Sequence, residues 1–156
     1  MTGNNLIVRH CTISEMEAAP NIMELLEEYA AESSISGLPH PSAKVDMYKH
    51  LEIMGEIYPI GAFLGDMLIG FITVLAPVLP HYSARVAVAE SFFVSKEYRS
   101  SGAGLKLLHA AQNRTKEANA CGLLVSAPLG GDLAEVLPHV GYTETNRVFF
   151  RSFGNE

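Results

Sequence analysis

A glycine-bearing turn is the feature of this chain most suited to chemistry. It reads Arg99-Ser100-Ser101-Gly102-Ala103-Gly104 and continues into Leu105 and an Ala/Leu-rich helical pattern. An apolar, β-type run over 86–94 precedes it. A turn between a strand and a helix presents several backbone N–H groups at a helix N-terminus, which favours the binding of phosphate groups. The sequence therefore predicts a phosphate-bearing ligand at this turn.

The two best-known glycine-rich phosphate sites do not fit the turn. A Rossmann fingerprint follows the first strand of a βαβ unit and has an acidic residue about 20 positions later, but no acid lies between Ala118 and Leu124. A Walker loop needs Gly-Lys-Ser/Thr, which is absent. With these two sites excluded, we interpret the segment as a phosphate-binding turn of another kind.

The elements around the turn predict a mixed α/β fold. Patterning predicts strands over 6–11, 58–64, 67–75, 86–94, 122–127 and 142–153. It predicts helices over 14–33, interrupted at Pro20, over 44–55 and over 102–120, and a short one from Asp132. Ser14 and Glu17 are expected to form a capping box. Hairpin-linked strands followed by strand–helix–strand indicate a mixed sheet with helices on both faces.

Composition places the chain among globular proteins of one domain, spanning 1–156. Hydrophobic residues make up 48% of its 156 residues, and 17 Asp and Glu against 11 Lys and Arg give a net charge of −6. This balance argues against nucleic-acid binding and suits a cationic substrate. Cys11 and Cys121 lack further ligands at zinc spacing, so no metal is expected. No signal peptide or membrane span is predicted, and we expect a cytoplasmic protein.

Residues 90–108, ESFFVSKEYRSSGAGLKLL, resemble the acetyl-CoA signature of the GCN5-related N-acetyltransferases, the GNAT superfamily. Members of that family end a strand in an apolar pair and Val, continue through Tyr-Arg to Gly-x-Gly, and then form a long helix. The predicted order of elements matches the family's acyl-CoA N-acyltransferase fold over nearly the whole chain. The resemblance implies a central mixed sheet flanked by helices and acetyl-CoA as cosubstrate.

The resemblance also implies roles for individual residues. Backbone N–H groups from Arg99 to Leu105, including Ser100, Ser101 and Ala103, would hold the CoA pyrophosphate, and glycine at 102 and 104 lets the main chain approach it closely. Backbone groups of three further residues would pair with the pantetheine arm: Phe92, Phe93 and Val94. An N–H near Val94 would polarise the thioester carbonyl in the manner of an oxyanion hole.

Glu90 is the candidate for handling the acceptor amine. It precedes Val94 by four residues, where polyamine acetyltransferases of this family carry an acid. A carboxylate there binds a cationic amine or acts through water as a general base. Strict strand alternation puts Glu90, Phe92 and Val94 on one face unless a bulge intervenes. Ser91 departs from the polyamine group's pattern, which often has Asp at this point.

The chain departs from the family in its last third. The family's Tyr before a Gly-Tyr pair, the usual acid for the leaving thiolate, is replaced by Leu137, and a frequent Asn is replaced by Gly130. The candidate substitutes for the acid are His139, Tyr142 and Ser126, or a water molecule. Because CoA thiolate is a good leaving group, loss of the acid need not abolish transfer.

Three interpretations follow. The leading one is an N-acetyltransferase that transfers acetyl directly to a primary amine, on a small molecule or a peptide, with a small cationic amine favoured. The second is an acyl-CoA-binding module of the same fold with weak or no catalysis. The third is an α/β domain whose glycine turn is structural only. The apolar segment with Phe149, Phe150 and Phe153 also suits pairing across a homodimer.

Overall fold

The computed structural model describes residues 5–42 and 44–154. Its central sheet has five strands in the order β1-β2-β3-β6-β7. The strands are β1 (Leu6–His10), β2 (Ile57–Leu64), β3 (Met67–Leu75), β6 (Ala87–Val94) and β7 (Leu123–Leu124). Neighbouring strands are antiparallel except β6 and β7, which are parallel, so the sheet is mixed as predicted.

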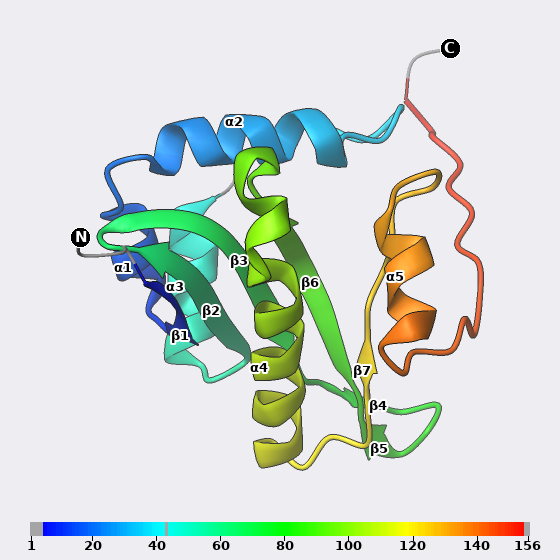
Figure 1. Ribbon diagram of the computed structural model, residues 1–156. Coiled ribbons are helices and arrows are strands. Elements are labelled where there is room, and N and C mark those ends of the chain that lie inside the picture. Colours follow the sequence, from blue (N-terminus) through cyan, green and yellow to red (C-terminus); the bar gives the residue numbers. More distant parts are fainter. Residues whose placement is uncertain (1–4, 43, 155–156) are drawn as a thin grey trace.

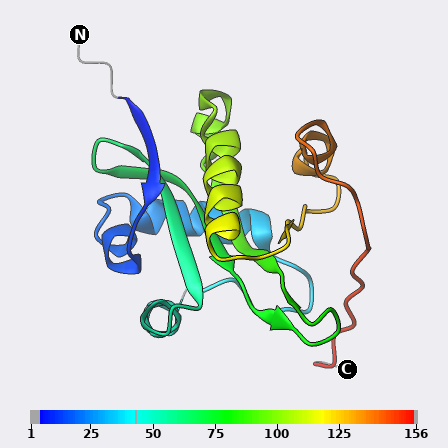
Figure 2. The ribbon, with the colours of Figure 1, turned by 90° about the horizontal axis from the view of Figure 1, so that it is seen from below.

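Helices cover both faces of this sheet (Figures 1 and 2). On one face lie α1 (Ile13–Glu17), α2 (Ile22–Ser33) and α3 (Val45–Ile53); on the other lie α4 (Ala103–Glu117) and the short α5 (Leu133–His139). A 3₁₀ helix, η1 (Lys96–Ser101), joins β6 to α4. The predicted arrangement of helices on both faces is confirmed.

The two faces bury separate cores. Beneath α4, Leu107 and Ala111 pack without exposure against β2 and β3 residues such as Ile60 and Ile72. On the opposite face, Leu25 of α2 and Phe71 of β3 belong to a second buried cluster. Burying apolar area on both sides fixes β3 and β6 in the middle of the molecule.

The first predicted helix is split, and its cap differs from the prediction. The predicted interruption at Pro20 is confirmed, because the segment forms two helices, α1 and α2, with Pro20 between them. Proline has no N–H with which to continue a helix. The capping box is formed by Thr12 and Glu15, not by Ser14 and Glu17. Thr12 accepts from the Glu15 amide at 3.0 Å, and the Glu15 carboxylate accepts from the Thr12 amide at 3.2 Å. The cap of this helix therefore lies two residues earlier than the pattern indicated.

The largest difference from the prediction concerns residues 142–153. These were expected to close the sheet, but the segment pairs with no strand and follows the outside of α5 (Figure 1). Phe149 and Phe153 are 89% and 94% exposed. β-type residues form a strand only where an edge can accept them, and β7 is just Leu123–Leu124, shorter than the strand expected over 122–127.

Smaller differences occur elsewhere. Residues 84 and 85, which lie outside the predicted strands and helices, form β5 (Ala84–Arg85), which pairs with β4 (Val78–Leu79) in a separate hairpin. The helix expected over 102–120 is α4, which ends at Glu117. Within the part of the chain that the structure describes, no helix has both the length and the hydropathy needed to cross a bilayer.

Candidate functional site

The edge of β6 that faces β7 is open for most of its length. β6 pairs with β7 only at Ala87 with Leu123 and at Val88 with Leu124. On its other edge, β6 pairs with β3 up to Val94, and the Ser95 amide donates to the Ile69 carbonyl at 2.9 Å. β6 and β7 therefore separate beyond Val88, and the gap between them is bordered by the backbone of β6.

Strand parity decides which β6 residues present backbone groups to this gap. In an antiparallel pair, alternate residues direct their N–H and C=O groups toward the partner. The Ser95 amide is bonded to β3, so the backbone groups of Phe93, two residues earlier and opposite Phe71, also point toward β3. The backbone groups of the alternate residues Phe92 and Val94 therefore point toward the open edge. Of the three residues expected to pair with a pantetheine arm, only Phe92 and Val94 have the required direction. The Phe93 ring instead lies 5.5 Å from the Tyr29 ring in the core.

The turn after β6 leads directly into α4, as the sequence predicts. Gly102 has φ +86°, a left-handed conformation that favours glycine. The Ala103 amide donates to Ser101 Oγ at 3.2 Å, and the Lys106 amide to the Gly102 carbonyl at 3.1 Å. The amides of Gly104 and Leu105 complete the first turn of the helix, where N–H groups have no intrahelical acceptor.

Gly104 has no structural reason to be glycine within this chain. A Cβ built there meets only Phe92 and Val94 atoms at 3.9 Å, an ordinary contact, and its φ is not left-handed. Glycine inside a helix is about 0.5–1 kcal/mol less favourable than alanine. A ligand lying against the backbone at this point explains the missing Cβ, so the turn fits the pyrophosphate expected from the sequence.

Arg99 is tied to the neighbouring elements. Its Nε donates to the Val94 carbonyl at 2.9 Å, its guanidinium pairs with Glu32 of α2, and it lies 5.4 Å from the centre of the Phe93 ring. Both members of the ion pair are 43% exposed, so the pair contributes little to stability and is easily exchanged. Arg99 therefore has a replaceable partner beside the turn.

Glu28 links α2 to the same turn. Its carboxylate accepts from Ser95 Oγ at 2.8 Å and from the Lys96 amide at 2.7 Å. The turn residues Ser100 and Leu105 are exposed, whereas Ala103 is buried as a whole residue and its amide donates to Ser101 Oγ. Of these three residues, Ser100 and Leu105 are accessible to a ligand and Ala103 is not.

Glu90 lies in a β-bulge. Thr73 pairs with Ser91 and Val74 pairs with Ala89, so Glu90 has no partner on β3. The extra residue turns Glu90 to the same side as Ser91, and Thr73 Oγ1 donates to Glu90 at 2.7 Å and lies 2.6 Å from Ser91 Oγ. Strict alternation predicted one shared face for Glu90, Phe92 and Val94. Because of the bulge, Glu90 instead lies on the face that is covered by α1–α3.

A tyrosine from α3 completes this group. The Tyr48 hydroxyl donates to the Glu90 carboxylate, with oxygen–oxygen distances of 2.9 and 3.1 Å. Burial, and then the negative charge of Glu90, raise the pKa of Tyr48 far above its usual value. Tyr48 is therefore a neutral donor at physiological pH. Burial and the charge of Glu90 likewise raise the pKa of Tyr29.

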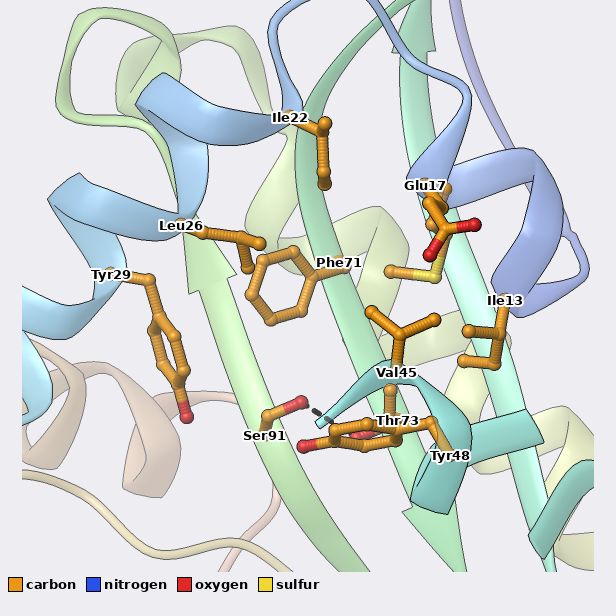
Figure 3. A pocket seen from close by; sticks show the side chains of 11 residues that line it. Ile13, Glu17, Ile22, Leu26, Tyr29, Val45, Tyr48, Phe71, Thr73 and Ser91 are labelled. Carbon is orange, nitrogen blue, oxygen red and sulfur yellow. Dashed lines mark hydrogen bonds between the residues drawn. The ribbon is translucent and has the colours of Figure 1, made fainter. Parts of the chain in front are cut away.

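A pocket extends from the hydroxyl groups of Tyr48, Thr73 and Ser91 into the space between the sheet and the helices α1, α2 and α3 (Figure 3). Thr73 and Ser91 form its polar end together with Tyr48. The rest is lined by hydrophobic side chains and Glu17: Ile13, Met16, Ile22, Leu26, Tyr29, Val45 and Phe71. The pocket and the β6–β7 gap lie on either side of β6, which places a candidate acceptor site next to a candidate CoA site.

The candidate thiolate acids His139 and Tyr142 lie in or after α5, and Tyr142 packs against the core on the α4 side of the sheet, opposite to the side that Glu90 faces. Tyr142 is half-buried, and its hydroxyl accepts from Gln112 Nε2 at 2.9 Å. Gln112 is nine residues beyond Ala103, which corresponds to about 14 Å along the helix axis. His139 is exposed at the end of α5, and Leu137 is buried against α4. The family's usual Tyr position is therefore a core position here.

Sequence reasoning missed Tyr48 and Thr73 as parts of the site. Tyr48 has the spacing of an inward-facing helical residue, and Thr73 is one polar residue inside an apolar strand. The one sequence feature that could have indicated a role is the polar Thr73 inside an apolar strand. The contacts of Tyr48 and Thr73 with Glu90 depend on how distant segments pack, which the sequence pattern does not show.

Comparison with known proteins identifies relatives of this arrangement. The model of the acetyltransferase (GNAT) family matches residues 20–128. A ribosomal-protein-alanine N-acetyltransferase from Brucella melitensis biovar Abortus 2308 has a similar structure, with a TM-score of 0.73 and 15% identity over 96% of this chain and 100% of that one.

Two further similar structures have different acceptors. One is an aminoglycoside acetyltransferase from an uncultured soil metagenomic sample, with a TM-score of 0.73, 16% identity and full coverage of both chains. The other is glucosamine-6-phosphate N-acetyltransferase from Arabidopsis thaliana, with a TM-score of 0.72 and 11% identity over 96% of this chain and 99% of that one. No curated protein matches the chain. At these identities the likeness shows the fold and does not choose an acceptor.

Proposed function

The chain belongs to the acetyltransferase (GNAT) family, and we propose that it transfers the acetyl group of acetyl-CoA to a primary amine held beside Glu90. The observation that carries this proposal is the bulge in β6. It turns the Glu90 carboxylate toward α3, where it accepts from Tyr48 and Thr73 at the polar end of the pocket, while Phe92 and Val94 direct backbone groups to the gap between β6 and β7.

The cosubstrate site in this proposal is built from backbone. Acetyl-CoA supplies an activated acyl group whose thioester carbon accepts a nucleophile. The amides of the first turn of α4 hold the pyrophosphate. The Arg99 guanidinium leaves its ion pair with Glu32 and pairs with the pyrophosphate instead. Phe92 and Val94 orient the pantetheine arm along β6, and one of their N–H groups polarises the thioester carbonyl. The bare backbone at Gly104 supports this assignment.

Glu90 prepares the amine for attack. An ammonium group has no lone pair, so it must lose a proton before it reacts. Glu90 takes that proton, directly or through a water molecule, while Tyr48 and Thr73 hold the carboxylate in place. The amine nitrogen then bonds to the acetyl carbon, the carbon–sulfur bond breaks, and the thiolate of CoA leaves with the electron pair. The second proton of the nitrogen passes to water as the neutral amide forms.

Protonation of the thiolate is assigned to solvent rather than to a side chain. The nearest family position holds the buried Leu137, and the Tyr142 hydroxyl is bonded to Gln112 far along α4. Since a thiolate is a good leaving group, it can depart before it is protonated and take its proton from water afterwards, so transfer does not require an acid. Replacement of Tyr142 by Phe and of His139 by Ala tests this point, because the solvent route predicts turnover within about twofold of wild type for both.

A thermal-shift titration tests the cosubstrate directly. Acetyl-CoA and CoA should each raise Tm by several degrees at saturating concentration, and ATP should not, because ligand binding to the folded state alone stabilises it. The absence of a shift with acetyl-CoA would leave the turn without a ligand and remove the main support of the proposal.

A binding module without catalysis is the second candidate, and the buried Leu137 is the observation that favours it. The two functions separate in a thiol-release assay with a panel of amines. An enzyme releases CoA in proportion to acetylated amine, whereas a binding module gives the same thermal shift with no amine-dependent release.

A further inference from the structure

The lining of the acceptor pocket points to a substrate class, on the premise that the function proposed above is correct. The pocket is bounded by apolar side chains from four elements, among them Leu26 of α2, Val45 of α3 and Phe71 of β3. Polar side chains gather at the β6 end, where the Tyr48, Thr73 and Ser91 hydroxyls meet (Figure 3). A molecule in this pocket is therefore surrounded by carbon except at one end.

The charges around the pocket allow for one cation. The Glu90 carboxylate is held by two neutral hydroxyl donors, and no Lys, Arg or His nitrogen of the described residues lies within 4.0 Å of it. Glu17, the other acid at the pocket, pairs with Lys49 at 3.1 Å. Glu90 thus has no protein cation as a partner at the polar end of the pocket, whereas Glu17 has one.

We propose that the acceptor is a primary monoamine with a compact apolar skeleton, such as an alkylamine or an arylalkylamine. Its amino group lies at Glu90, and its hydrocarbon part fills the space between Leu26, Val45 and Phe71. A second ammonium group would have to displace Lys49 from Glu17, and the hydroxyl groups of an aminosugar would lose water against the apolar lining without gaining a partner, which is unfavourable. Polyamines and aminoglycosides are therefore poor acceptors.

The proposal predicts how rate depends on chain length. Each methylene group buried from water contributes about a fourfold gain in kcat/KM until the pocket is full. We would measure thiol release with propylamine, butylamine, pentylamine and hexylamine, and then with 1,5-diaminopentane. The diamine has the length of hexylamine but carries a second ammonium in place of the methyl group. We expect kcat/KM for hexylamine to exceed that for the diamine by at least about tenfold. A diamine or an aminoglycoside that reacts faster than hexylamine overturns the assignment.

A pair of charge variants ties this preference to the pocket. Leu26→Glu adds a carboxylate to the lining and should reverse the preference in favour of 1,5-diaminopentane. Met23→Glu makes the same charge change at a 66% exposed position of the same helix, outside the lining, and should leave the ratio unchanged. If Leu26→Glu does not fold, judged by its thermal melt, Leu26→Ala replaces it and should flatten the dependence on chain length.

Failure of the transfer and failure of the substrate class give different results. If no amine releases CoA but hexylamine raises Tm in wild type and not in Leu26→Glu, the class stands and the catalytic proposal fails. If release occurs equally with all amines, and Leu26→Glu alters none of the ratios, transfer stands and the class is wrong. No release and no amine-dependent shift overturn both.

Discussion

The hydroxyl of Tyr48 donates to both carboxylate oxygens of Glu90, joining α3 on one side of the sheet to the bulge in β6. The contact spans 42 residues of sequence. It fixes the direction of a carboxylate at the polar end of the pocket, and it does so with a neutral partner. No Lys, Arg or His nitrogen of the described residues lies within 4.0 Å of this carboxylate, so it is available to an incoming ammonium group.

Glu90→Gln removes that charge while preserving the size of the side chain. We expect kcat/KM to fall by about 100-fold at neutral pH, since general-base contributions are typically of this order or larger. The acetyl-CoA Kd should stay within about twofold of wild type, because the CoA contacts proposed for β6 are made by backbone on its other edge. Glu27→Gln, an exposed change on α2, is the matched control. Equal turnover of Glu90→Gln and wild type at every pH would remove Glu90 from the mechanism.

Tyr48 makes stability depend on pH at the alkaline end. Its pKa is raised in the folded protein, mainly by burial, so the folded state holds this proton more tightly than the unfolded chain does. The resulting stability is complete below the unfolded pKa of about 10 and is lost as pH rises toward the folded value. Urea unfolding should therefore show wild type losing its advantage over Tyr48→Phe above about pH 10. Parallel pH profiles for the two proteins would contradict this account.

Gly104→Ala should separate stability from ligand binding. A Cβ at this position meets no close protein atom, so the substitution should stabilise the fold by about 0.5–1 kcal/mol. The same Cβ would project where the pyrophosphate approaches, and acetyl-CoA affinity should fall at least about tenfold, or ~1.4 kcal/mol. Chemical denaturation and calorimetric titration measure the two effects.

Gly102→Ala provides the comparison. Its left-handed φ of +86° makes any side chain strained there, so this variant should lose about 1 kcal/mol or more of stability. If Gly104→Ala binds acetyl-CoA as wild type does, Gly104 does not form the ligand cradle.

Glu32→Gln should strengthen acetyl-CoA binding. The change removes a negative charge beside the proposed pyrophosphate site and releases the Arg99 guanidinium from its ion pair. We expect a gain of about two- to fivefold at low salt that disappears at high salt, because both side chains are partly exposed and screened. Isothermal titration at two ionic strengths checks this, with Glu27→Gln as a charge-matched control. Weaker binding in Glu32→Gln would mean that the ion pair organises the turn instead of competing with its ligand.

The two cysteines should differ in reactivity. Cys11 is buried, and burial, followed by the nearby charge of Glu15, raises its pKa to about 12. Cys121 is exposed. Titration with a disulfide reagent near pH 8 should therefore modify Cys121 alone in the folded protein and both cysteines after denaturation. Rapid reaction of Cys11 under native conditions would contradict the packing of α1 against the sheet.

The features predicted correctly from the sequence are those set by local patterns. The strand over 86–94, the glycine turn and the following helix were all recognisable from apolar patterning, Gly102 and the Ala/Leu run. Thr12 and Ser14 are both acceptable N-caps by type, and choosing between them requires the path of the chain after β1.

The features missed depend on contacts between distant segments. The direction of Glu90 follows from a bulge whose position is set by pairing with Thr73 and Val74, and alternation along one strand cannot reveal it. The partnership with Tyr48 has the same non-local origin. Residues 142–153 have strong β propensity, yet β7 presents too short an edge for them to pair with.

The most direct test of the central claim is to identify the product. Hexylamine and acetyl-CoA would be incubated with wild type and with Glu90→Gln, and free CoA and acetylated amine would be quantified together by a thiol assay and mass spectrometry. The account predicts that wild type forms N-acetylhexylamine in equal amount to the CoA released, and that Glu90→Gln forms about 100-fold less per unit time. Acetyl-CoA binding with no acetylated amine from any primary amine tested, or CoA release without an acetylated product, would contradict it.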